Sequence, residues 1–199
     1  MDLQKTIDNL RANWMMVDVV EDGAAALAFV KNLLPMGACV SSGGSATLAQ
    51  SGILDLIKGA DYNYIRPASD AVDYYFCSSN AVTEGGELYN VDGHSSRVSP
   101  VCCGPKHVVM VVSVNKIVPD LAAAVHRVKS IAAPMNTKQL DRDTPCHKTG
   151  VCQAITEGKR GMTDGCMADS RICCSFLVSA KQRIKDRMHV IFVREQLGF

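Results

Sequence analysis

Apolar residues along the chain switch between helical spacing and short continuous runs, and this pattern is typical of an α/β protein. Leu3, Ile7 and Leu10 share one face of a predicted helix over 3–14, and the apolar run at 15–20 that follows predicts a buried strand. The same alternation continues along the chain. We expect further helices at 21–34, 47–58 and 115–134, and further strands at 38–42, 72–78, 108–114 and 188–193.

Strands that alternate with helices predict a largely parallel sheet, because the helical crossovers cover both of its faces. No internal repeat and no long linker divides the sequence. We therefore expect a single α/β domain over 1–199. Its irregular part is a polar, cysteine-bearing excursion at about 141–176, before the last strand.

Composition and charge exclude several classes of protein. The 199 residues are 47% hydrophobic and 21% charged, with a formal net charge of +1, which is a globular balance without a basic stripe. We therefore expect no nucleic-acid partner. The apolar runs are too short to cross a bilayer and the first residues lack the features of a signal peptide, so we expect no membrane association and a cytoplasmic location. Thiols stay reduced in that compartment.

A glycine-containing turn, VSSGGSATL at 40–48, joins a predicted strand to a predicted helix. Gly43 and Gly44 would let the backbone approach a ligand closely, and the free amides of a helix start favour an anion. Ser45 and Thr47 add hydroxyl groups. The alternative is a tight turn in which Ser45 only caps the helix. The turn matches neither the P-loop nor the dinucleotide fingerprint.

A polar stretch at 78–97 begins where a strand ends, which is where open α/β sheets bind ligands. Its central TEGGELYN also predicts a hairpin turned by Gly85 and Gly86, and for Glu87 and Tyr89 we prefer that interpretation. The polar residues that remain as candidates for ligand binding are Asn80, Glu84, Asn90, Asp92 and Arg97.

Cysteines are concentrated in the irregular excursion. Cys146, Cys152, Cys166 and Cys173 are separated by five, thirteen and six residues. Thiolates at four points of a polar loop suit zinc or an iron–sulfur cluster. No pair has the two-residue gap of a zinc ribbon or a ferredoxin, so thiols without a metal are the alternative. The cysteines that lie in apolar runs are expected in the core: Cys39, Cys77, Cys102 and Cys103.

Several of these stretches together resemble the lactate-utilisation (LUD) domain family: SSNAVTEGGELYNVDG, GPKHVVMVVSVNKIVPDL, TPCHKTGVC and DSRIC. The resemblance runs in one order over nearly the whole chain. It implies a Rossmann-like, mostly parallel sheet with helices on both faces, similar to that of the sugar-phosphate isomerase and CoA-transferase superfamily. The better-known members act in an iron–sulfur-containing complex that oxidises L-lactate to pyruvate, so the resemblance also implies a link to L-lactate utilisation.

The resemblance extends to individual residues. Those that match the family's glycine loop, its polar turn and the NK pair after its long strand are Gly43, Gly44, Ser45, Thr47, Asn80, Thr83, Glu84, Gly86, Asn90, Asp92, Gly93, Arg97, Asn115 and Lys116. The family's cysteine pattern matches the four cysteines of the excursion. Two departures stand out: the segment 62–76 is shorter than usual, and thirteen residues at 153–165 separate the second and third cysteines, where two are usual.

Two functions are compatible with these residues. An enzyme or enzyme subunit of organic-acid metabolism would hold a small anionic metabolite, a carboxylate or a phosphate, between 43–47 and 80–97. Glu84 or Asp92 would then be the general base and Lys116 an electrostatic partner. Electrons from lactate would pass to a cluster or to partner subunits. The alternative is a non-catalytic binder of a small anion or a partner, in which the four cysteines form a structural metal clasp. A homodimer is compatible with either.

Overall fold

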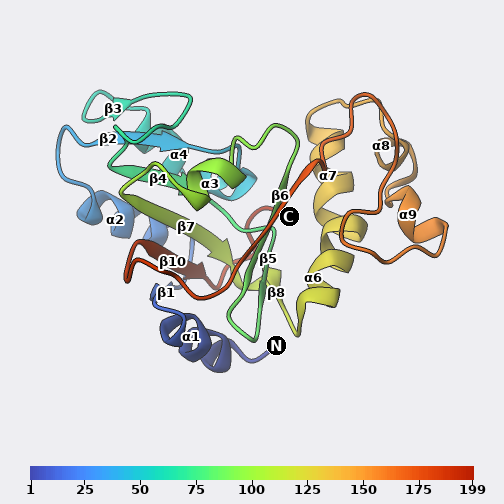
Figure 1. The fold of residues 1–199 in the computed structure, drawn as a ribbon. Helices are drawn as coiled ribbons and strands as arrows, with labels where there is room; N and C mark the ends of the chain where they lie inside the picture. Colours follow the sequence, from blue (N-terminus) through green and yellow to red (C-terminus); the bar gives the residue numbers. More distant parts are fainter.

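The computed structural model describes all 199 residues, and two β-sheets organise the fold (Figure 1). In the larger sheet every neighbouring pair of strands is parallel. Its strands, in spatial order, are β1 (Met16–Val20), β10 (Met188–Val193), β7 (His107–Ser113), β4 (Tyr74–Cys77), β2 (Cys39–Ser42) and β3 (Asn63–Tyr64). This six-stranded parallel sheet with helices around it confirms the predicted α/β, Rossmann-like class.

The smaller sheet is mixed. Its strands, in spatial order, are β8 (Ile117–Val118), β5 (Ala81–Thr83), β6 (Leu88–Asp92) and β9 (Ser175–Ser179). The β5–β6 hairpin is antiparallel, as the sequence predicts, and β9 pairs antiparallel with β6. The apolar pattern did not predict β9, because all five of its residues are only half-buried.

Short helices connect the strands. In chain order they are α1 (Leu3–Ala12), α2 (Gly23–Leu33), α3 (Ala46–Gln50), α4 (Ile53–Ile57), α5 (Val98–Cys102), the 3-10 turn η1 (Val114–Lys116), α6 (Leu121–Arg127), the π-helical turn η2 (Val128–Ala132), α7 (Ala133–Gln139), α8 (Pro145–Thr149) and α9 (Gln153–Thr156). The helix expected at 47–58 is divided into α3 and α4, because Gly52 has a left-handed φ of 74°. No helix has both the length and the apolar character needed to span a membrane.

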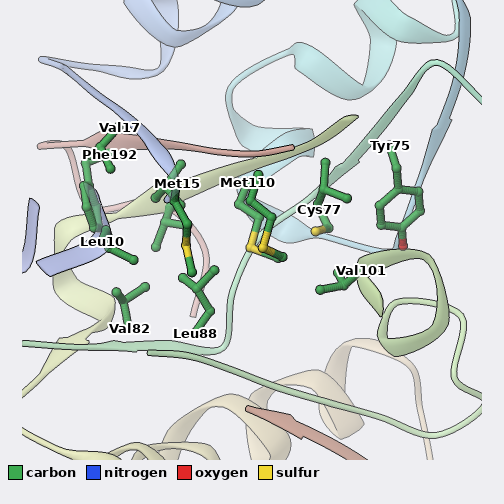
Figure 2. Close-up of a cluster of buried hydrophobic side chains, with 14 of the residues drawn as sticks. Leu10, Met15, Val17, Tyr75, Cys77, Val82, Leu88, Val101, Met110 and Phe192 are labelled. Atoms are coloured by element: carbon green, nitrogen blue, oxygen red, sulfur yellow. The ribbon is translucent and has the colours of Figure 1, made fainter. Parts of the chain in front are cut away.

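Three hydrophobic clusters fill the space between the layers. One lies under α2, α3 and α4 on one face of the larger sheet. A second lies between the two sheets and α1, where Leu10, Met15 and Leu88 converge (Figure 2). The third lies between the smaller sheet and α6 with η2. The order of layers is therefore helices, parallel sheet, mixed sheet, helices (Figure 1).

The predicted core cysteines have different environments. Cys77 is fully buried in the cluster between the sheets (Figure 2), and burial raises its pKa to about 12. Cys39 is half-buried against the same cluster. Cys102 and Cys103 are exposed, so the prediction is wrong for them. They lie at the end of the short α5, whose inner face is taken by Pro100 and Val101.

Candidate functional site

A cleft of about 860 Å³ lies at the carboxyl ends of three neighbouring strands of the parallel sheet, β2, β4 and β7. Residues 44–47 follow β2, residues 78–80 follow β4, and Lys116 follows β7. The turn after β6 and the end of α7 complete the walls, together with the segment 169–172. The carboxyl edge of a parallel sheet is the usual place for a ligand in this class of fold, and the cleft agrees with that rule.

Lys116 occupies the floor of this cleft and is 3% exposed. Its ammonium group donates hydrogen bonds to Thr47 Oγ1 at 2.9 Å and to Ser78 Oγ at 3.1 Å, so it joins the ends of all three strands. Burial lowers the pKa of Lys116 to about 7, and the positive charges of Arg127 and Arg97 act in the same direction. A lysine with that pKa can give up or accept a proton near neutral pH.

Arg97 joins the glycine loop to the polar turn. Its guanidinium donates to the Gly44 carbonyl at 2.6 Å and to Asn80 Oδ1 at 3.0 Å, while its buried Nε has no partner. Asp92 fixes the turn that carries Arg97, because its carboxylate accepts the backbone N–H groups of Ser95, Arg97 and Val98. The role of Asp92 in this geometry is to position Arg97.

The cleft carries an excess of positive charge. Five basic residues line it, against two acidic ones, Asp92 and Asp169. None of the five forms an ion pair with a carboxylate. The five are Arg66, Arg97, Lys116, Arg142 and Arg171. Unpaired cations facing one concave surface attract an anion.

Eight of the predicted site residues line the cleft: Gly44, Ser45, Thr47, Asn80, Asp92, Gly93, Arg97 and Lys116. Ser45 also caps α3 by accepting the Leu48 N–H at 3.3 Å, as the tight-turn alternative predicts. Gly43 lies just behind the wall, where a Cβ atom would be 2.6 Å from Tyr75 Oη. Its glycine identity is therefore explained by packing.

The remaining predicted residues lie elsewhere. Glu84 is at the turn of the β5–β6 hairpin, where it accepts hydrogen bonds from the Asp2 N–H at 3.0 Å and from Lys5 at 3.1 Å. These contacts lower its pKa, and the expectation that Glu84 is a general base in the cleft has no geometric support. Thr83 pairs with Glu87 inside the hairpin. Neither Asn90, a buried residue of β6, nor Asn115, which is exposed in η1, is part of the cleft wall.

Sequence reasoning missed several residues of the cleft. Ser78 lies inside the polar stretch but was not singled out from it. Arg66, Arg142 and Arg171 are isolated arginines on three separate loops, and nothing in their local sequence shows that they face one cleft. Arg127 is buried in α6 and donates to the Asn80 carbonyl at 2.7 Å. Its position at the end of an apolar helix gives no local sign of this contact.

The four cysteines of the excursion, Cys146, Cys152, Cys166 and Cys173, line a second, small cavity of about 30 Å³. All are free thiols, and the thirteen-residue insertion does not keep Cys166 away from the other three. As the side chains stand, no three His, Cys, Asp or Glu groups are arranged to hold a metal ion. The pKa of the Cys173 thiol is raised to about 12, first by burial and then by the three neighbouring cysteines.

Taken together, a Rossmann-like parallel sheet and a cleft lined by basic residues at its carboxyl edge define this α/β protein. The sequence profile of the LUD domain matches residues 3–193, and the chain belongs to the LUD domain family. Among solved structures, the chain is similar to a DUF162 family protein from Deinococcus radiodurans. That match has 13% identity and a TM-score of 0.53 and covers 96% of this chain and 94% of the other, so it bears on the fold alone. A search of curated proteins finds no match.

Proposed function

We propose that this protein binds a small anionic metabolite, a carboxylate or a phosphate ester, in the cleft around Lys116 and Arg97, and that it serves organic-acid metabolism linked to L-lactate utilisation. Membership of the LUD domain family supports the metabolic context. The observation that carries the binding proposal is the set of five cleft cations without a carboxylate partner.

The size of the cleft bears on the ligand. Its volume of about 860 Å³ is near the upper end of the range for small-molecule sites, about 300–1,000 Å³. A three-carbon acid fills only a small part of that space. We therefore expect the anionic group to bind near Lys116 and Arg97, and a larger body or a second anionic group to extend toward Arg66 and Arg142.

Lys116 is the residue best suited to proton transfer in this cleft, since its pKa is lowered to about 7. Asp92 is occupied by three backbone N–H groups. Oxidation of a 2-hydroxy acid to a 2-oxo acid removes two electrons and two protons. In this proposal Lys116 exchanges protons with the ligand, and the electrons pass to an iron–sulfur-containing partner subunit.

One observation favours the alternative, a non-catalytic binder of small anions. No carboxylate in the cleft is placed as a free base, because Asp92 is a positioning group and Asp169 lies on an exposed loop. In that case the protein delivers or senses an anion, and the cysteine segment is a structural element.

Calorimetric titration at low salt with L-lactate, pyruvate, inorganic phosphate and a phosphorylated hydroxy acid tests the proposal. The double variant Arg66→Gln/Arg142→Gln is informative because neither side chain forms a hydrogen bond within the protein, so the fold should be unaffected. We expect its affinity to fall by about tenfold to a hundredfold, as for lost charge-assisted contacts.

The matched control is Arg183→Gln, an exposed arginine that does not line the cleft. It should leave the affinity unchanged. Equal weakening in the control and in the double variant, or no binding of any of these anions, would contradict the proposal. Conversion of bound lactate in the presence of an artificial electron acceptor would favour the enzyme over the non-catalytic binder.

A further inference from the structure

The second cavity gathers four thiols from four points of the chain. Cys146 comes from α8, Cys152 precedes α9, and Cys166 and Cys173 come from the irregular segment before β9. The chain folds back on itself so that all four reach one enclosed space of about 30 Å³. Spacing along the sequence, with five, thirteen and six intervening residues, does not require this meeting. The convergence is a property of the fold.

Basic groups surround this cavity. Lys129 is 5% exposed and lines it, and its ammonium group donates to the Gly161 carbonyl without any carboxylate partner. Arg171 lines it as well and donates to the carbonyls of Cys166 and Cys173, at 2.9 and 2.8 Å. The one carboxylate on the wall, that of Asp164, accepts the Gly161 N–H. A buried cation without a counter-charge is costly in free energy, so this site lacks a compensating negative charge as long as the thiols are neutral.

The segment that bears the cysteines has almost no core of its own. Between 153 and 174 only Ala154 is buried, and α9 is its single helix. Its apolar contacts with the rest of the protein come from partly buried side chains such as Met162 and Cys173. Small structures of this kind are commonly held by a crosslink, either disulfides or a metal. All the cysteines here are free thiols, so a crosslink in this segment would have to be a metal.

The ligand set indicates the kind of metal group. The four thiols line one small cavity, with a volume of about 30 Å³. Four thiolates are a usual ligand set of structural zinc, and the complex carries a net negative charge that Lys129 and Arg171 offset.

We propose that Cys146, Cys152, Cys166 and Cys173 bind one zinc ion, which fixes the segment 144–174 against α7 and β9. Cys146 Sγ now lies 3.4 Å from Thr144 Oγ1 and 3.6 Å from Thr137 Oγ1, so it must turn from these hydroxyls toward the cavity. The ion deprotonates the thiols as it binds. The zinc proposal does not rest on the identity of the ligand in the cleft.

Metal analysis of the reduced full-length chain, produced in the presence of zinc, tests this proposal. We expect about one zinc per chain. Cys173→Ser should lower the occupancy at least tenfold, whereas Cys174→Ser, its exposed neighbour in the sequence, should retain the zinc. The cobalt-substituted chain should show the thiolate charge-transfer and intense visible bands of a tetrahedral sulfur site. Absence of stoichiometric metal, iron with acid-labile sulfide in its place, or equal loss in Cys174→Ser would overturn the proposal.

A measurement on the unmodified chain protects the test against a variant that fails to fold. The rate of alkylation of each cysteine is measured by mass spectrometry. The four cavity cysteines should be alkylated at least tenfold more slowly when zinc is bound than after the zinc is removed by a chelator. The exposed Cys102, Cys103 and Cys174 should react at the same rate in both conditions. If zinc leaves the rates of the four unchanged, the proposal is wrong. Lys129→Gln should weaken zinc binding by about tenfold, as groups around a metal's ligands do.

Discussion

Lys116→Met is expected to make the folded protein more stable while removing anion binding. The folded state holds the Lys116 ammonium group in a buried position with two hydroxyl partners and with the charges of Arg97 and Arg127 nearby. In the unfolded chain the same group is fully hydrated. Methionine has a similar length and no charge, so it fills the same space without the cost of desolvation.

The magnitude follows from the lowered pKa of Lys116. A change from 10.5 to about 7 corresponds to about 5 kcal/mol of destabilisation, as an upper limit, when the lysine is charged in both states. Loss of the hydrogen bonds to Thr47 and Ser78 offsets about 2 kcal/mol of that gain. We therefore expect Lys116→Met to raise the free energy of unfolding by about 2–3 kcal/mol at pH 7.

The sign of the pH dependence is fixed by the same pKa. Between pH 7 and 10.5 the unfolded chain binds more protons at Lys116 than the folded one does, so the stability of the unaltered protein rises with pH in this window. The stability of Lys116→Met lacks this pH dependence. The amount by which its free energy of unfolding exceeds that of the unaltered protein should therefore shrink by about 2 kcal/mol from pH 7 to pH 9.

Urea denaturation at pH 7, 8 and 9 under reducing conditions measures this difference directly. The control is Lys185→Met, an exposed lysine whose replacement should leave the stability within about 0.5 kcal/mol at every pH. A Lys116→Met protein that is less stable at pH 7, or whose advantage is the same at pH 7 and 9, would refute the description of Lys116 as a desolvated cation.

Further expectations concern the cleft and its supports. Anion affinity should fall from pH 6 to pH 9 as Lys116 loses its proton, and calorimetry that finds the same affinity at both values would remove Lys116 from the binding site. Gly93→Ala places a Cβ atom 3.2 Å from Ile172 Cα, so the melting temperature should drop and proteolysis of residues 153–174 should become faster. An unchanged rate of proteolysis would contradict the close contact. Gly43→Ala should lower the free energy of unfolding by about 1–3 kcal/mol, because its Cβ would lie 2.6 Å from Tyr75 Oη. Adding Tyr75→Phe should recover part of that loss, whereas strictly additive effects of the two substitutions would count against this clash.

The strands of the parallel sheet could be predicted from sequence because they are buried on both faces. The runs at 108–114 and 188–193 are apolar except for Ser113 and His189, and they form β7 and β10 in the middle of the sheet. The glycine loop and the polar turn could be placed for a related reason, since both follow such strands. Parallel order brings their carboxyl ends to one edge, so the approximate position of the cleft followed from the pattern.

Glu84 shows where that reasoning was incomplete. In a hairpin the residues that flank the two strands lie at one end and the turn lies at the other. Asn80 precedes β5 and Asp92 ends β6, so both face the cleft, while Glu84 in the turn is separated from them by the length of the strands. The hairpin turn predicted by Gly85 and Gly86 therefore places Glu84 away from the cleft.

The isolated arginines of the cleft could not be predicted, because their meeting depends on contacts between distant segments. Arg142 follows α7, and Arg171 lies on a segment whose position is set by the pairing of β9 with β6. That pairing joins residues more than eighty positions apart, and β9 lacks the apolar alternation that would predict it. Non-local pairing of half-buried strands leaves no local signal.

The two cavities share one wall, and this has a thermodynamic consequence. Arg171 and Ile172 line both the cleft and the cysteine cavity, and Ile172 packs directly on Gly93 of the polar turn. A zinc ion that fixes this segment therefore also fixes one face of the anion site. Coupling between two ligands of one protein is reciprocal, so an anion in the cleft must tighten zinc binding by the same factor by which zinc tightens the anion. A chelated protein that binds the anion as tightly as the zinc form would show that the shared wall transmits nothing between the two sites.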